Sequence, residues 1–413
     1  MRSSKRLPVA CSLLSIAALA LSACAQSDDA GGDSDALRIG YVLPETGGIA
    51  FLGPGMIGAV KLATAEINDA GGVLGSDVVL TGGDEGEGDG SVATQTVDRL
   101  LNTDTVSAVI GAAGSGISLK IIDKIVTAGV VQCAPSNTSP TFTDYDDDGY
   151  YFRAAASDEL LAPVFAQLIV DDGGKRVAVV GRADDYAQRL GDLTVQEVEK
   201  AGADASDPIL YDPTAQDFDA EIRKIVSYKP DAMVLIAFDE TSTILRGLIE
   251  AGYGPQDIPI YVGTGSKKTD LAEQVEPGNK AAVEGLRGVN PAATSQAAFL
   301  DKLRGEVPDL SATQFTGEAY DCVTTVALAA QQAESTDPQK IRDNMVSVTE
   351  GGTKCTTFAD CKKLIDEGED IDYDGVSGPI DLADNGDPTK ATYEQWEFQS
   401  DGSIKTLNTV NAG

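Results

Sequence analysis

The stretch VIGAAGSGIS, residues 109–118, indicates the class of fold. An apolar run over 106–110 enters a turn with three glycines, and the segment after it places Ile117, Ile121 and Ile125 at helical spacing. A buried strand that passes through a glycine-rich turn into a helix is the repeating unit of α/β folds. The free amides at the start of such a helix suit an anion, either a nucleotide phosphate or a ligand carboxylate.

The same strand–helix unit recurs along the chain and predicts parallel sheets covered by helices. In the first half we expect strands at 37–44, 77–84, 106–112 and 130–135, with helices at 53–72, 92–101 and 116–129. A second run has strands at 176–181, 207–212, 232–238 and 259–263, with helices at 158–171, 184–201, 217–228 and 240–251. Two runs suggest two α/β lobes. Further on we expect a strand at 284–292, a helix at 314–334 and a terminal hairpin formed by 378–387 and 391–403.

The N-terminus has the order of a signal peptide, a basic segment followed by an apolar one, over residues 1–23. The stretch LSAC that ends at Cys24 resembles a bacterial lipobox, which implies lipidation of Cys24; a plain secretory signal is the alternative. A polar tether is expected at 24–36. Cleavage removes three basic residues and no acidic ones, so the net charge of −34 becomes −37. This charge argues against nucleic acid and anionic lipid as partners. We expect an exported protein, anchored by lipid to the outer face of the cytoplasmic membrane.

The chain contains no histidine, which excludes histidine-dependent triads and histidine–metal sites. In an exported protein the four cysteines after Cys24 indicate disulfides. The short spacing favours a Cys355–Cys361 bridge, and Cys133 with Cys322 is either a second bridge or two buried thiols. Two segments, 144–149 and 370–375, have the acid spacing of calcium loops, but neither continues as such a site requires. We therefore expect no metal and no cofactor.

The glycines of the opening stretch do not form a nucleotide-binding motif. Their order is G-x-x-G-x-G after the third strand, whereas the dinucleotide fingerprint is G-x-G-x-x-G after the first, and the chain has no P-loop lysine motif. This excludes a nucleotide and leaves two readings of the loop: a carboxylate held by the amides and the dipole at a helix N-terminus, or a tight turn that needs small residues and binds nothing.

Several stretches in this order resemble the type I periplasmic solute-binding proteins of the leucine/isoleucine/valine-binding group. They are IGYVLPETGGIAFLG, AEINDAGGVLG, VIGAAGSGIS, APSNTSPTFT, DDYAQRLG and DYDGVSGPIDLADNGD. The resemblance implies two lobes joined by three crossings near 152–157, 285–291 and 374–379, with a ligand cleft between them. Lobe one would comprise 37–155 plus 289–375, and lobe two 156–288 plus 376–408.

The resemblance also implies a set of ligand contacts. Ser115, with Gly114 before it, matches the position that holds the ligand carboxylate. Ser136, Asn137 and Thr138 lie in the stretch PSNTSP, whose family counterparts bind the carboxylate and ammonium groups. In the second lobe, Tyr186 and Phe238 match aromatic positions that cover the ligand, and Phe51 with Leu52 is expected to line an apolar pocket.

One departure bears on the ligand. Amino-acid receptors of this group carry an acid at the position of Gly265, so the expected ammonium partner is missing. Asp239, Glu240 or Asp184 are the candidate substitutes.

We expect a receptor of an ABC importer, not an enzyme, that captures a small carboxylate-bearing solute such as a branched-chain or related amino acid and docks on the membrane permease. The alternatives are an amide, urea-like or aromatic or organic acid ligand, a sensory ligand-binding ectodomain and, in another class, a hydrolase with paired carboxylates or a Ser/Lys site.

Overall fold

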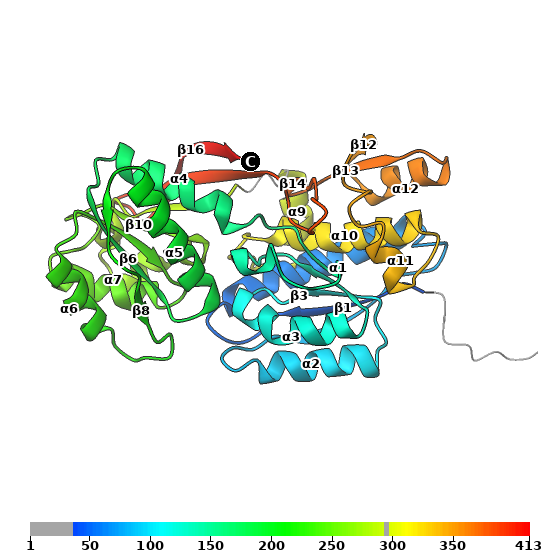
Figure 1. Ribbon diagram of the computed structural model, residues 1–413, viewed down its shortest axis with the longest axis horizontal. Helices are drawn as coiled ribbons and strands as arrows, with labels where there is room; N and C mark the ends of the chain where they lie inside the picture. Colours follow the sequence, from blue (N-terminus) through cyan, green and yellow to red (C-terminus); the bar gives the residue numbers. More distant parts are fainter. Residues whose placement is uncertain (1–35, 293–296) are drawn as a thin grey trace, which may run out of the picture. The chain divides into compact units, whose positions relative to one another are not determined.

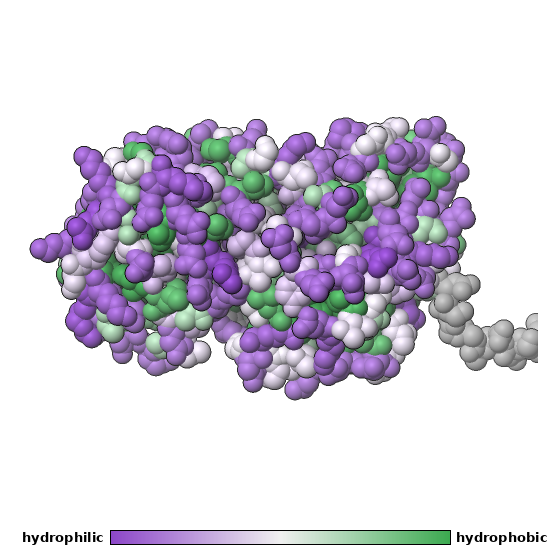
Figure 2. Space-filling model, viewed as in Figure 1, coloured by the Kyte–Doolittle hydropathy of each residue, from purple (hydrophilic) through white to green (hydrophobic). Residues whose placement is uncertain are grey.

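The computed structural model describes residues 36–292 and 297–413. The predicted signal peptide, Cys24 and the tether up to residue 35 lie outside the described residues. In the described part, the helical stretch Ala50–Asp69 is long and apolar enough to cross a membrane, but 61% of its most apolar window is buried within the protein. Burial of that kind is typical of a core helix. The face seen in Figure 2 is mainly hydrophilic, in keeping with the acidic composition.

Five parallel strands of the described chain form the first sheet, in the order β2-β1-β3-β4-β5 (Figure 1). Their bounds are β1 Arg38–Leu43, β2 Val79–Asp84, β3 Ala108–Gly111, β4 Val131–Ala134 and β5 Tyr151–Arg153. The helices around it are α1 Gly53–Asp69, α2 Ser91–Asn102, α3 Ser115–Thr127 and α10 Thr316–Gln332. Ile39 and Leu43 of β1 pack in one core with α1 and α10, whereas Val42 packs in another with α2 and α3. Alternate side chains of a strand point to opposite faces, so this sheet is covered on both.

The second sheet has the order β16-β15-β11-β10-β9-β6-β7, with β8 also paired to β6. Its strands are β6 Arg176–Arg182, β7 Asp204–Ala205, β8 Ile209–Tyr211, β9 Ala232–Ile236, β10 Ile260–Val262, β11 Arg287–Pro291, β15 Ala391–Phe398 and β16 Ile404–Ala412. The strands from β6 to β11 are parallel, while β15 and β16 are antiparallel to their neighbours. The helices are α4 Asp158–Asp171, α5 Asp185–Lys200, α6 Asp219–Tyr228, α7 Thr241–Glu250 and α8 Leu271–Val275. The expected α/β class and the alternation of strands and helices are confirmed.

The predicted terminal hairpin is wrong in its pairing. Strand β15 pairs with β16, which follows it, and not with 378–387. The segment before β15 belongs to the first lobe instead, because Leu382 lies in its core and Asp387 forms a buried ion pair with Arg153 of β5, with 2.6 Å between Oδ1 and Nε. A buried arginine requires such a partner. We therefore propose that the chain makes its last crossing at 383–390, later than the 374–379 expected from the sequence.

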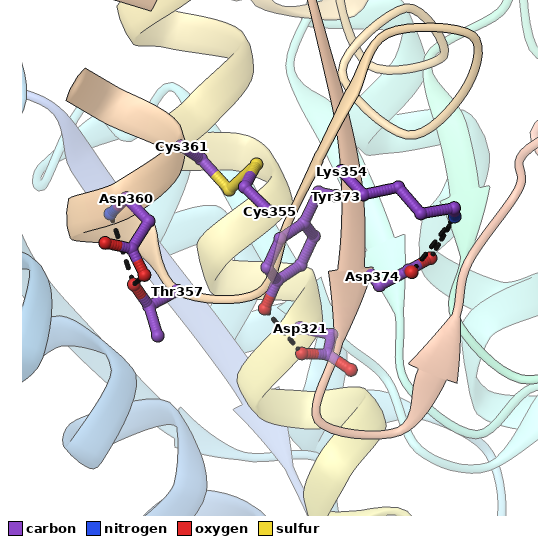
Figure 3. Close-up of a disulfide and its surroundings, with 8 residues drawn as sticks. All are labelled: Asp321, Lys354, Cys355, Thr357, Asp360, Cys361, Tyr373 and Asp374. Carbon is purple, nitrogen blue, oxygen red and sulfur yellow. Dashed lines mark hydrogen bonds and ion pairs between the residues drawn. A yellow bond between two sulfur atoms is a disulfide. The ribbon is translucent and has the colours of Figure 1, made fainter. Parts of the chain in front are cut away.

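A small sheet and two disulfides complete the first lobe. The sheet consists of β12 Thr353–Cys355, β13 Ile371–Gly375 and β14 Gly378–Pro379, and helix α12 Phe358–Asp366 packs against it. The remaining helices of this lobe are α9 Ala297–Glu306, which packs on α1, and α11 Pro338–Arg342, which packs on α10 and β4. Cys355 and Cys361 are joined, and close by Asp321 of α10 accepts a 2.8 Å hydrogen bond from the Tyr373 hydroxyl (Figure 3). A second bridge joins Cys133 of β4 to Cys322 of α10.

The calcium-like spacing of the two acidic segments has a structural counterpart in the second one. The second one, 370–375, is mostly strand β13, which hydrogen-bonds to both neighbouring strands. Within the described residues, no group of three or more acidic or cysteine side chains is arranged to hold a metal ion.

Candidate functional site

The turn between β3 and α3 presents backbone amides at the carboxyl edge of the first sheet. It begins at Gly111, whose φ is +117° and where a Cβ would lie 2.0 Å from the carbonyl oxygen of Val42, so only glycine fits. Helix α3 then begins at Ser115, and Gly114 before it offers no side chain to cap the helix. The first amides of α3 are therefore available to an acceptor that comes from elsewhere.

The turn after β4 lies against this loop and forms the second part of the wall. The Ser136 hydroxyl donates a 3.0 Å hydrogen bond to the carbonyl of Ala113. The Asn137 amide, which is fully buried, donates to the carbonyls of Ala112 and Ala113 at 3.0 and 2.9 Å. Asn137 therefore fixes one loop to the other.

The second lobe contributes an aromatic pair. The rings of Tyr186, on α5, and Phe238, after β9, are stacked with their centroids 5.6 Å apart. The guanidinium of Arg182, at the end of β6, lies 4.4 Å from the centre of the Phe238 ring. Arg182 is buried and pairs with Asp184 at 2.7 Å, with Glu240, and with Glu87 of the first lobe at 3.2 Å. This ion pair with Glu87 links the two lobes.

These walls enclose a cavity of about 620 Å³, a volume typical of a small-molecule site. Among the residues predicted to contact ligand, those that line it include Gly114, Ser115, Ser136, Thr138, Tyr186 and Phe238. Three others, Asn137, Phe51 and Asp239, do not line it. Asn137 is buried between the loops, Phe51 packs under the ammonium of Lys268 at 4.4 Å, and Asp239 pairs with Lys268. Leu52, next to Phe51, does line the cavity.

The structure leaves no room for a side chain at position 265. A Cβ on Gly265 would lie 2.1 Å from Cδ1 of Phe238 and 2.8 Å from the carbonyl oxygen of Ala237. The Phe238 ring therefore occupies the space that any side chain at 265 would need.

The three acids considered as substitutes already have cationic partners. Asp184 caps α5 through a 3.0 Å bond from the amide of Ala187 and pairs with Arg182. Glu240 pairs with Arg182 and accepts a 3.1 Å bond from the amide of Phe238; burial raises its pKa, although Arg182 opposes the rise. Asp239 is bound to Lys268.

Sequence reasoning missed an acid in the cavity wall, Glu85. It follows β2 directly, has no exposed surface and lines the cavity. Burial raises its pKa to about 8. In the sequence, Glu85 stands in the run GGDEGEGDG, which is indistinguishable from a solvated acidic loop; its place at a strand end was the available signal.

Two α/β lobes with a polar and aromatic cavity between them are an architecture suited to binding a small molecule. Residues 36–393 match the periplasmic binding protein family, and the chain belongs to this family. Its fold is that of the type I binding proteins, and the expectation of a solute-binding protein and not an enzyme is confirmed.

Three similar proteins illustrate the membership. The chain is 27% identical over 388 residues to Leu/Ile/Val-binding protein homolog 1 of Brucella melitensis, covering 89% of this chain and 92% of that protein. It is 25% identical over 397 residues to the chemotactic signal transduction system substrate-binding protein BasB of Halobacterium salinarum, covering 91% and 90%. The crystal structure of the leucine binding protein LivK from Thermotoga maritima has the same fold, with a TM-score of 0.76, 22% identity and coverage of 91% and 98%.

Proposed function

We propose that the protein is an extracellular, lipid-anchored receptor that captures a small carboxylate-bearing solute and delivers it to an ABC importer. The observation that supports capture of a carboxylate is Ser115 at the open N-terminus of α3, on the same cavity wall as Ser136 and Thr138. Amides and a hydroxyl at a helix N-terminus attract an anion. Lipidation at Cys24 and docking on the permease rest on the lipobox and on the family.

In the proposed mechanism, lobe one holds the carboxylate and lobe two closes over the rest of the ligand. Tyr186 and Phe238 line the cavity from the second lobe and Ser115 lines it from the first, so the ligand would lie between them. Closure would be a hinge motion of the kind known in two-domain binding proteins. The closed form would then be the one that the permease recognises.

The ligand class that we propose is a branched-chain or related amino acid, which the names of the Brucella and Thermotoga proteins support. An amide, a urea-like solute or an aromatic or organic acid is the alternative, and the lack of an acid at Gly265 favours it. A sensory role is a second candidate function, because BasB belongs to a chemotactic system.

The test is native mass spectrometry of the purified protein, which identifies a co-purified solute by mass. A thermal-shift panel of amino acids, amides and organic acids follows. We expect a solute with a carboxylate to raise the melting temperature in a concentration-dependent way. If only uncharged amides or ureas do so, the proposed carboxylate ligand is wrong.

A further inference from the structure

The buried carboxylate of Glu85 has no cationic partner. Its Oε2 accepts a 2.5 Å hydrogen bond from the amide of Ala113, and its Oε1 accepts a 3.1 Å bond from the amide of Gly114. No lysine or arginine of the described residues forms an ion pair with it. A carboxylate out of contact with water requires a compensating charge or the loss of its own charge. Its place in the cavity wall makes a ligand the available source of that charge.

The two amides that Glu85 occupies immediately precede Ser115. These two amides are therefore not available to a ligand carboxylate, which would have to bind at Ser115 instead. Because Gly114 and Ser115 are consecutive, Glu85 and a carboxylate bound at Ser115 would lie at neighbouring positions of one turn. This arrangement suits a ligand whose carboxylate and amine are carried by the same carbon atom.

We propose that Glu85 receives the protonated amine of the ligand and so takes the place of the acid that is absent at Gly265. The assignment rests on the proposed function, because it requires that a solute with a carboxylate binds at Ser115. In this assignment, the acid that binds the ligand amine lies on the first lobe, whereas the acid expected at position 265 would have lain on the second. Both charged ends of an amino acid would then bind before the lobes close, and the second lobe would contact only its side chain.

The charged groups around Glu85 agree with this assignment. On its own loop, Asp84 raises the pKa of Glu85 further and Glu87 is paired with Arg182. From the second lobe, Asp184 is also paired with Arg182. From α3, Lys120 lines the cavity without forming an ion pair with Glu85. Asp185, which pairs with Arg189, and Asp212 also line the cavity, both from the second lobe. Of the two acids that line it from the first lobe, Glu85 and Glu87, Glu85 is the one without an ion pair.

A ligand amine would change the protonation of Glu85. With a pKa of about 8, the carboxyl is mostly protonated at pH 7 in the empty protein. A bound ammonium stabilises the carboxylate form and lowers this pKa, so binding should release a proton. The release at pH 7 should be a measurable fraction of one proton per ligand.

The experiment uses isothermal titration calorimetry with L-isoleucine and with 3-methylpentanoate, which lacks only the amine. Titrations at pH 7 in phosphate and in Tris, whose ionisation enthalpies differ, give the number of protons released. The variants are Glu85→Gln and, as a matched control, Asp89→Asn, which makes the same carboxyl-to-amide change at an exposed position in the same loop. Melting curves confirm that both variants are folded.

We expect the wild type to bind isoleucine with proton release, and Glu85→Gln to bind it about 10- to 100-fold more weakly without release. Affinity for 3-methylpentanoate should be weak in the wild type and should not fall further in Glu85→Gln. If isoleucine binds the wild type and Glu85→Gln equally, or without proton release, Glu85 only supports the loop; the inference then fails while the proposed function stands. If neither probe binds the wild type, both fail for this ligand class.

Discussion

The two disulfides should differ in how much they stabilise the protein, because they close loops of very different length. The Cys133–Cys322 bridge spans 189 residues and the Cys355–Cys361 bridge spans 6. In the chain-entropy description, the loss on removing a bridge grows with the logarithm of loop length. It amounts to about 5 kcal/mol for the long loop and about 2 kcal/mol for the short one at 25 °C. All four cysteines are buried, so the cost of truncating the side chains is similar in both pairs.

The comparison requires two double variants, Cys133→Ala with Cys322→Ala, and Cys355→Ala with Cys361→Ala. Urea unfolding followed by far-UV circular dichroism gives the free energy of unfolding for each. The single tryptophan, Trp396, is buried in the second lobe, and its fluorescence reports separately on that lobe. We expect the long-bridge variant to lose about 3 kcal/mol more than the short-bridge variant. Equal losses, or a greater loss for the short bridge, would refute the reasoning from loop length.

Three further predictions concern the cavity. Ser115→Ala should weaken binding of a carboxylate ligand by about 1.5–3 kcal/mol in calorimetry, the scale of a charge-assisted hydrogen bond; unchanged affinity would remove Ser115 from the site. Gly265→Ala should lower the free energy of unfolding by about 1–3 kcal/mol through its contact with Phe238, and by less when Phe238 is also alanine; additive losses in that double-mutant cycle would contradict the steric account. Burial raises the pKa of Glu85 to about 8, so the native state binds more protons than the unfolded chain between about pH 4.5 and 8. Stability should therefore fall as pH rises through this window, by up to about 5 kcal/mol from this group. Glu85→Gln should remove that part of the slope in urea titrations, and an identical slope in both proteins would show that Glu85 keeps an ordinary pKa.

The repeating parts of the fold are readable from the sequence. The spacing of Ile117, Ile121 and Ile125 predicts α3, because burial of one face imposes a helical period on the apolar residues. Strand β16 was missed for the opposite reason: it lies at a sheet edge and most of its side chains are exposed, so no apolar alternation marks it. The pairing of Cys133 with Cys322 is a long-range fact that spacing does not determine.

The site was predictable to the extent that the carboxyl ends of parallel strands share one edge of a sheet. This rule brings Ser115, after β3, together with Ser136, after β4. It does not say which side chain of a turn faces the cavity, and Asn137 points instead into the contact between two loops. This rule also does not distinguish a buried acid such as Glu85 from the exposed acids next to it in the sequence, because burial depends on how the loop folds.

The ring of Phe238 beside Gly265 also has an evolutionary consequence. An ancestor or descendant with the acid that the resemblance leads us to expect at position 265 would need a smaller residue at 238, because the ring leaves no room for a Cβ. An acid at 265 alone would clash with the Phe238 ring, and a smaller residue at 238 alone would leave a void in the second lobe. Exchange between the two ligand-recognition schemes therefore passes through an unfavourable intermediate sequence, and the residues at 238 and 265 should change together among homologous receptors.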